Sequence, residues 1–288
     1  MQLPGETADV IATMSTVWDR TTEFLSDNLA SVTPIALLGI FVPLTLLGNL
    51  MPLMKSDGQI ADLTIGVIVL VLSLVTIWGG IAITALAFDP PAGRSAAVAT
   101  ANRRFLPVLG ISLLTALIVL VLVMPIGVAL GMSGMDMTAL AAGRQPAPPT
   151  NAGGVRFAGL YFLVLVPFLL WAYARFVLLI TPIMVMERRG FGVYGRAFVL
   201  TRRIGWKVIG LILLYAIVSW VASAAANTVF GSVFRLLIGG EGAVTLASVL
   251  THIVVAATST IFSVLATAFV AKLYLATRDA REAIVEAA

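Results

Sequence analysis

The chain has 288 residues, of which 60% are hydrophobic and 11% are charged, and its formal net charge is +4. Soluble globular domains carry about 45–50% apolar and about 25% charged residues, so this composition excludes an ordinary soluble domain and indicates a protein embedded in a lipid bilayer. The absence of cysteine excludes disulfides, thiolate metal sites and cysteine nucleophiles.

The first residues, MQLPGETADVIATM, are polar and contain no basic segment followed by a short apolar run. A cleaved signal peptide needs both features. The sequence therefore predicts that the first membrane span is retained.

Six stretches without formal charge are long enough to cross a bilayer, which takes about 20 apolar residues. They comprise residues 28–54, 63–88, 105–135, 157–174, 208–234 and 242–271. The fourth extends to residue 186 if Arg175 is tolerated within it. We therefore predict an all-α integral membrane protein in which residues 1–288 form a single membrane domain with six transmembrane helices. The longest external connection, residues 132–154, is rich in Gly, Pro, Ala and Thr and is typical of a flexible loop.

Basic residues are distributed unevenly between the connections. If the N-terminus is cytoplasmic, thirteen of the eighteen fall on the cytoplasmic side: Arg20, Arg94, Arg103, Arg104, Arg188, Arg189, Arg196, Arg202, Arg203, Lys207, Lys272, Arg278 and Arg281. The opposite side receives Lys55, Arg144, Arg156 and Arg235. Since basic residues concentrate in cytoplasmic loops, this distribution predicts that both termini are cytoplasmic.

Two segments of the chain, residues 95–114 and 195–214, are similar to each other. Their alignment pairs Ala97 with Ala197, Arg103 with Arg203, Val108 with Val208 and Gly110 with Gly210. A fainter third copy, residues 17–41, has Pro34 at the position that Pro107 occupies in residues 95–114. The repeat predicts three units, each an interfacial helix followed by a transmembrane hairpin, at about residues 15–88, 94–186 and 192–277.

The most charged stretch of the chain is residues 187–210. In a helix, its apolar residues from Val193 to Ile204 form one stripe, while Arg196 and Arg203 share a neighbouring face, as in helices that lie among lipid headgroups. The arginines either only fix the topology or form a site for an anionic lipid or a phosphate ligand. The candidate lipid- or ligand-binding residues are Arg103, Arg175, Glu187, Arg196, Arg202 and Arg203.

Arg175 lies within the fourth span, where an arginine at the bilayer centre costs about 2.5–3.5 kcal/mol. It is placed towards the cytoplasmic third, so its side chain can reach the headgroups or satisfy carbonyls exposed by a kink at Pro182. A substrate or lipid contact is the alternative. Glu187 is expected to pair with Arg188, Arg196 or Arg203.

His252, the only histidine, falls in the external half of the last span. No carboxylate lies near it in the sequence, so we expect a hydrogen-bonded packing residue rather than a proton relay. Small residues such as Gly79, Gly80 and Ala82 are expected to allow close contact between helices.

Residues 175–210 resemble the recurrent core of a bacterial membrane-domain family. The similarity rests on Arg175, Pro182, Glu187, Gly192, Ala197, Arg202, Arg203, Trp206 and Gly210, and on the ending AKLYLATRDARE at residues 271–282. This family occurs attached to some glycerophosphodiester phosphodiesterases and also as stand-alone proteins. That enzyme domain uses paired histidines and metal-binding carboxylates, which this chain lacks. The resemblance therefore implies the membrane module without the enzyme, as a multi-pass protein of the bacterial inner membrane.

The sequence contains no phosphate-binding loop, zinc signature or G-x-S-x-G motif, and its basic segments lack the aromatic platform of a nucleic-acid-binding domain. The acidic residues flank the spans rather than interrupt them, which argues against an ion- or proton-coupled pump. We therefore expect no catalytic residue, no metal, no cofactor and no nucleic-acid partner.

Three hypotheses for function remain. The leading one is a scaffold or regulator without enzymatic activity, whose basic interfacial helices engage anionic lipid headgroups, a protein partner or a second copy of the chain. The second is a transporter or channel for a lipid-like or small amphipathic solute, motivated by the prolines in the spans and by Arg175; a polar cavity reaching the middle of the membrane would favour it. The third, an enzyme acting on lipid, lacks a paired acid and base.

Overall fold

The structure is a computed structural model that describes residues 14–55, 59–136, 145, 148–187, 190–202, 204–239 and 244–286. Six helical segments are long and apolar enough to cross a membrane: Leu29–Leu53, Leu63–Phe88, Pro90–Met132, Ala152–Met186, Gly205–Ile238 and Leu246–Ala283. The predictions of an all-α protein and of six spans are confirmed. The protein is a polytopic membrane protein.

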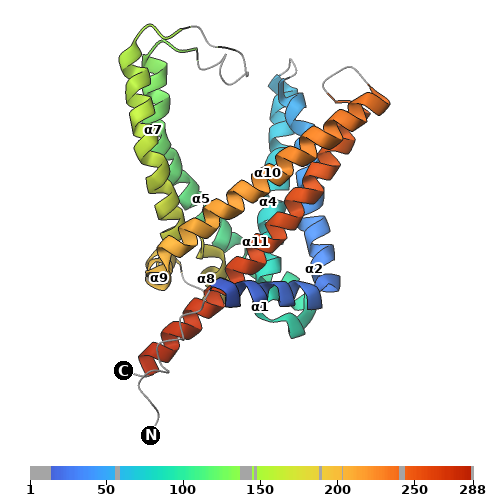
Figure 1. Cartoon of the computed structure of the whole chain (residues 1–288), viewed down its shortest axis with the longest axis vertical. Helices are drawn as coiled ribbons and strands as arrows, with labels where there is room; N and C mark the ends of the chain where they lie inside the picture. Colours follow the sequence, from blue (N-terminus) through green and yellow to red (C-terminus); the bar gives the residue numbers. More distant parts are fainter. Residues whose placement is uncertain are drawn as a thin grey trace.

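The chain begins with helix α1 (Met14–Asp27), which lies across one end of the bundle (Figure 1). Its inner face is formed by Val17 and Phe24, which are buried, so α1 is an amphipathic helix packed under the spans. The first span then comprises α2 (Leu29–Ala36), the π-helical turn η2 (Leu37–Phe41), α3 (Val42–Leu50) and η3 (Met51–Lys55). Pro43 has no N–H to donate one turn back, and the helix widens into η2 just before it.

The second and third spans are joined by a tight turn. Helix α4 (Gln59–Phe88) is followed by η4 (Pro90–Ala92) and α5 (Gly93–Met132). Asp89 caps η4, since its Oδ1 accepts a hydrogen bond from the Ala92 N–H at 3.4 Å. Gly93 has φ +77°, a conformation that side chains with a Cβ rarely adopt, and so allows the chain to reverse.

The fourth span bends near its basic end. It comprises α7 (Ala152–Ala172), the π-helical turn η5 (Tyr173–Val177) and α8 (Ile180–Met186). The short helix α9 (Val193–Thr201) leads into α10 (Gly205–Ile238), and α11 (Leu246–Glu286) ends the described chain. Helix α5 ends at Met132 and α7 begins at Ala152, and much of the predicted external loop, residues 132–154, lies outside the described residues.

The three predicted repeat units differ at their first helices. Separate short helices, α1 and α9, precede the first and the last pair of spans, but the basic segment of the middle unit is continuous with its span in the 40-residue α5. In the predicted alignment Gly205 corresponds to Phe105. Glycine is a poor helix former and follows the break between α9, which ends at Thr201, and α10, which begins at Gly205, whereas Phe105 lies inside α5. The expected separate interfacial helix is therefore absent from the described residues of α5, and the repeat itself stays a prediction.

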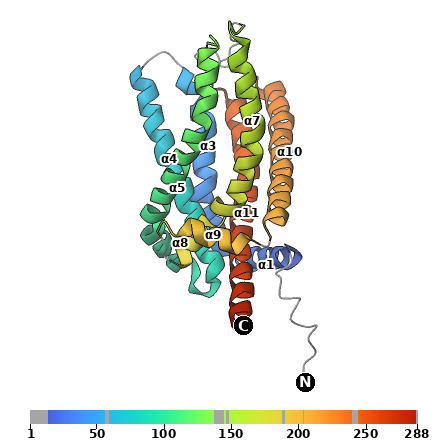
Figure 2. The same ribbon diagram turned by 90° about the vertical axis from the view of Figure 1, so that its left-hand side faces the viewer.

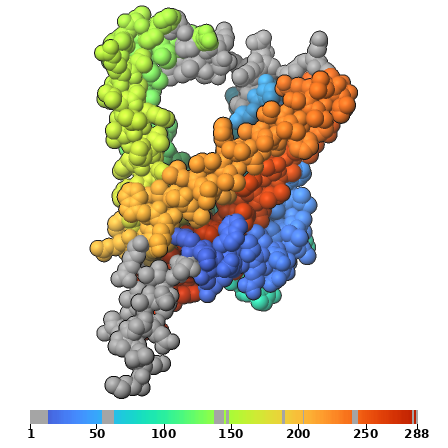
Figure 3. All heavy atoms as spheres, viewed as in Figure 1, coloured from blue at the N-terminus to red at the C-terminus, as the bar shows by residue number. Residues whose placement is uncertain are grey.

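The helices converge at one end of the bundle and diverge at the other. We call the end that holds α1, α9 and the end of α11 the basic end (Figures 1 and 2). The main buried cluster includes Val17, Leu86, Ile183 and Tyr274, all of which come from elements that meet at this end. At the opposite end, the hairpin of α5 and α7 leans away from α10 and α4 (Figure 1). Figure 3 shows a hollow between α7 and α10.

Two glycines allow the first two spans to cross in close contact. Gly39 lies in η2 and Gly79 in α4, and a Cβ built on Gly39 would lie 2.7 Å from the Cα atom of Gly79. A Cβ on Gly79 would lie 2.8 Å from the carbonyl oxygen of Gly39. The two backbones are thus in contact, which confirms the predicted packing role of Gly79.

Candidate functional site

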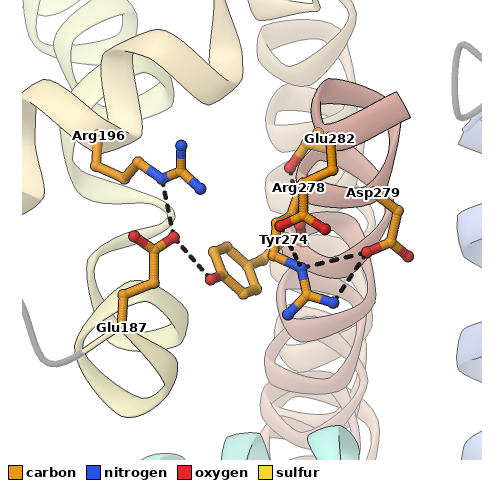
Figure 4. Close-up of polar contacts among 7 residues, drawn as sticks. Glu187, Arg196, Tyr274, Arg278, Asp279 and Glu282 are labelled. Carbon is orange, nitrogen blue, oxygen red and sulfur yellow. Dashed lines mark hydrogen bonds and ion pairs between the residues drawn. The ribbon is translucent and has the colours of Figure 1, made fainter. Parts of the chain in front are cut away.

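A carboxylate at the basic end joins three helices (Figure 4). Glu187 follows the last turn of α8, and its Oε1 accepts hydrogen bonds from Arg196 Nε of α9 and from the Tyr274 hydroxyl of α11, each at 2.8 Å. The side chains of Glu187 and Arg196 are 15% and 21% exposed, and Tyr274 is fully buried. Of the three predicted partners of Glu187, Arg196 is confirmed, while Arg188 and Arg203 lie outside the described residues.

Arg175 is held by the end of α9. It lies in η5, and its Nη1 donates a hydrogen bond to the carbonyl of Thr201 at 2.7 Å, while the Thr201 hydroxyl donates to the carbonyl of Arg175 at 3.2 Å. A cation at a helix C-terminus also interacts favourably with the helix dipole. The guanidinium lies 5.8 Å from the ring centroid of Phe198 and directly against Gly205. Its acceptor is therefore the last turn of α9 rather than the carbonyls near Pro182 that the sequence suggested.

This arrangement requires a residue without a side chain at position 205. We expect Gly205→Ala to displace the guanidinium of Arg175 and to destabilise the protein by about 1–3 kcal/mol, because the half-buried guanidinium then loses its hydrogen bond to the Thr201 carbonyl. Thermal unfolding in detergent measures the effect. Gly210→Ala is the control, since it lies on the same helix and a Cβ there meets nothing within 4 Å. Equal unfolding temperatures for the two variants would contradict the assignment.

Five of the six predicted site residues are described, and they lie in different surroundings. Arg175 is engaged with Thr201, and Glu187 with Arg196. Arg103 is exposed on α5, Arg202 is exposed at the end of α9, and Arg203 lies outside the described residues. Arg103 lines a separate hollow together with Arg104. Among the described candidates, Arg175 and Glu187 therefore make contacts within the protein, and Arg103 lines an open hollow.

His252 makes the contact expected of a packing histidine. Its Nδ1 lies 3.0 Å from Oδ1 of Asn49, which links α11 to α3 within the spans. The ring also packs on Gly48, where an added Cβ would lie 3.2 Å from the ring. The prediction of a hydrogen-bonded histidine is confirmed.

Sequence reasoning missed an intramembrane cavity between the spans. Its volume is about 590 Å³, and it lies between α4, α5, η5, α8, α10 and α11, with Trp18 of α1 at its edge. Eight hydroxyl-bearing residues line it: Thr76, Thr84, Ser112, Tyr173, Thr181, Tyr215, Ser263 and Thr267. No charged side chain lines it among the described residues. A second hollow of about 650 Å³ along α5 shares Ser112, Tyr173, Leu178 and Thr181 with the cavity, so the two adjoin.

The hydroxyls of the cavity fall into two groups. Thr76, Thr84 and Thr267 donate hydrogen bonds to helix carbonyls one turn back, as threonines in membrane helices commonly do. In the part of the chain that the structure describes, five others make no hydrogen bond through their hydroxyls: Ser112, Tyr173, Thr181, Tyr215 and Ser263. A hydroxyl in an apolar environment costs about 1–3 kcal/mol without a partner. The cavity is therefore built to receive water or a bound polar group.

Part of this lining has a signal in the sequence. Thr76, Gly80 and Thr84 are spaced four apart on α4, and Ser263 and Thr267 are spaced four apart on α11. This spacing places each set on one helix face. Two small-polar stripes in apolar spans could have indicated a shared polar interior, but no pattern indicates that the stripes face each other.

Comparison with known protein families, with characterised proteins and with solved structures finds no match for this chain. The resemblance to the membrane domain of glycerophosphodiester phosphodiesterases therefore stays a prediction. The class that the fold and the cavity define is a polytopic membrane protein with a hydroxyl-lined interior.

Proposed function

We propose that this protein binds an amphipathic, lipid-like molecule in its intramembrane cavity and moves it across or out of the bilayer without converting it chemically. The observation that supports this function is the group of five hydroxyls, from Ser112 to Ser263, that line one cavity and make no hydrogen bond within the described residues. Such groups need a partner, and a bound molecule supplies it.

The lining of the cavity favours an uncharged polar group attached to an apolar body. Apart from its hydroxyls, the wall is aliphatic and aromatic and includes Trp18, Phe262 and Phe269. A charged group would enter without a counter-charge among the described lining residues, which is costly inside a membrane. The second hollow extends along α5 past Val119 and Val123 and offers space for an apolar chain.

We infer that the molecule enters the cavity from one side. The hollow between α7 and α10 widens away from the basic end (Figure 3). Two side chains that line the cavity, Ile81 and Val108, are each 1% exposed. Transporters that alternate between two open states have a barrier on one side of a site near the middle of the membrane. With both termini cytoplasmic in a bacterial inner membrane, the open side is the external one.

A second candidate is a scaffold or regulator that engages anionic lipid or a protein partner at the basic end. Exposed cations favour it: Arg94, Arg103, Arg202 and Lys207 are solvent-accessible at or near this end. Each cation near an anionic leaflet contributes about 1 kcal/mol of attachment. Arg196 and Arg175 contribute less to such a surface, because both are engaged within the protein.

Removal of cavity hydroxyls tests the proposed function. We expect protein purified from its own membrane to retain an amphipathic molecule, and the double variant Ser112→Ala, Thr181→Val to retain about thirtyfold less, because two lost hydrogen bonds of roughly 1 kcal/mol each add up to roughly 2 kcal/mol. Native mass spectrometry measures the retained species. Reconstitution of that species in vesicles with wild-type protein then measures its movement across the bilayer.

The matched control is Ser219→Ala, Thr228→Val, which removes one serine hydroxyl and one threonine hydroxyl from α10; neither residue lines the cavity. It is expected to retain as much of the molecule as wild type. Equal retention by wild type and both variants would overturn the cavity assignment. If the retained species crosses the bilayer at the same rate in vesicles with and without the protein, the proposed transport is overturned.

A further inference from the structure

A third hollow lies at the basic end. Its volume is about 470 Å³, and it is formed where α4 ends, α5 begins and α8 ends. Its polar lining is Asp89, Thr100, Arg103 and Arg104, and its apolar walls include Phe88 and Met186. Unlike the intramembrane cavity, this hollow brings charges of both signs together.

We propose that this hollow binds the headgroup of a zwitterionic phospholipid, with the phosphodiester on Arg103, Arg104 and Thr100 and the ammonium group on Asp89. This site is separate from the intramembrane cavity, since the two share no lining residue, and it does not depend on whether the cavity binds a molecule.

The cationic half of the hollow is on one face of α5. Thr100 precedes Arg103 by three residues and Arg104 by four, which places the hydroxyl beside both guanidinium groups. Arg103 and Thr100 make no ion pair and no side-chain hydrogen bond with other residues that the structure describes. Guanidinium groups bind phosphate oxygens with paired, charge-assisted hydrogen bonds. The arginines and the threonine hydroxyl thus form a site for a phosphate group.

The anionic half comes from the turn before α5. The Asp89 carboxylate is exposed, and its Oδ1 accepts a hydrogen bond from the Ala92 N–H. A headgroup with only negative charge would place that charge near this carboxylate, whereas an ammonium group is attracted to it. Charge complementarity across such a site determines which partner is preferred. The carboxylate therefore favours a zwitterionic headgroup over an anionic one.

The position of the hollow favours a lipid over a soluble molecule. Phe88 is the last residue of the second span and Met186 the last of the fourth, so the hollow lies where the apolar part of the bundle ends. Lipid headgroups occupy this depth of the bilayer. The apolar walls contact the glycerol and the first methylene groups of a lipid, which a soluble headgroup lacks.

Lipid competition tests the proposal. Delipidated full-length protein is offered equal amounts of phosphatidylethanolamine and phosphatidylglycerol, and native mass spectrometry counts the lipids that stay bound. We expect wild type to prefer phosphatidylethanolamine by about fivefold, which is the effect of one favourable charge contact of about 1 kcal/mol. Arg103→Gln is expected to lower total retention by about fivefold, and Asp89→Asn to abolish the preference while phospholipid still binds.

Two exposed residues supply matched controls. Arg94→Gln removes an arginine from the first turn of the same helix, and Asp19→Asn removes a carboxylate from α1; neither residue lines the hollow. Both are expected to behave as wild type. A preference of wild type for phosphatidylglycerol, or no preference, would overturn the proposal, as would equal losses in Arg103→Gln and Arg94→Gln. Displacement of the lipid by soluble glycerophosphoethanolamine would overturn the assignment to a membrane lipid.

Discussion

Gly79→Ala is expected to destabilise the protein by about 3 kcal/mol and to reduce sharply the yield of folded protein. The new Cβ would lie 2.8 Å from the carbonyl oxygen of Gly39, and the atoms that must move are backbone atoms of two helices. Side chains forced into a packed contact typically cost about 1–3 kcal/mol, and a backbone obstacle places this site at the upper end. Unfolding in a denaturing detergent, followed by circular dichroism, measures the loss.

Gly66→Ala is the control for this experiment. Gly66 also lies in α4, and a Cβ there meets nothing within 4 Å. Since alanine is the better helix former, this variant is expected to match or slightly exceed wild type. Gly39→Ala is expected to behave like Gly79→Ala, because a Cβ at either position meets the other backbone. If both variants at the crossing unfold like Gly66→Ala, the two spans do not touch there.

Glu187→Ala is expected to destabilise the protein by about 3 kcal/mol, the lower end of the range for breaking a buried ion pair, because the side chains of Glu187 and Arg196 are 15% and 21% exposed. It removes the acceptor of both Arg196 and Tyr274, and Tyr274 is fully buried. Tyr274→Phe deletes one of the two hydrogen bonds and is expected to cost about 1.5–3 kcal/mol, because the acceptor is charged. Thermal unfolding of the purified variants gives both values.

The comparison for this cluster is Glu282→Ala. Glu282 lies 3.6 Å from Arg278 one turn away on α11, and its side chain is 62% exposed. Exposed pairs of this kind contribute about 0.3–0.5 kcal/mol. We therefore expect Glu282→Ala to unfold nearly as wild type does. A Glu187→Ala variant as stable as Glu282→Ala would show that the contacts among α8, α9 and α11 do not depend on this carboxylate.

The parts of this fold that the sequence predicts are those that depend on local patterns. Charge-free runs locate all six spans, because burial in a bilayer acts on each apolar segment separately. The pairing of Glu187 with Arg196 was among the predicted options, since nine residues separate the two. Helix α5 begins at Gly93, twelve residues before its charge-free run, because arginines are compatible with a helix that extends beyond the bilayer.

The parts that the sequence does not predict depend on contacts between distant segments. Tyr274 is 87 residues from Glu187, and Arg175 is 26 residues from Thr201. The Arg175–Thr201 contact forms because α9 folds back against η5, and the Glu187–Tyr274 contact forms because α11 packs beside α8. No periodicity in the sequence records either arrangement. The intramembrane cavity is harder still to predict from the sequence. Its hydroxyls come from different helices, and each one alone is ordinary for a membrane span.

The length of α11 has a mechanical consequence. Its 41 residues span about 60 Å, roughly twice the thickness of the hydrocarbon core of a bilayer. The excess projects at the basic end, where α11 extends past α1 (Figure 1). Helix α11 has buried side chains as far as Thr277, so the projecting part is residues 278–286, about 13 Å long, and a tilt of about 10° moves its tip by about 2 Å. Small rearrangements among the spans are thereby converted into displacements that a molecule in the aqueous phase can sense.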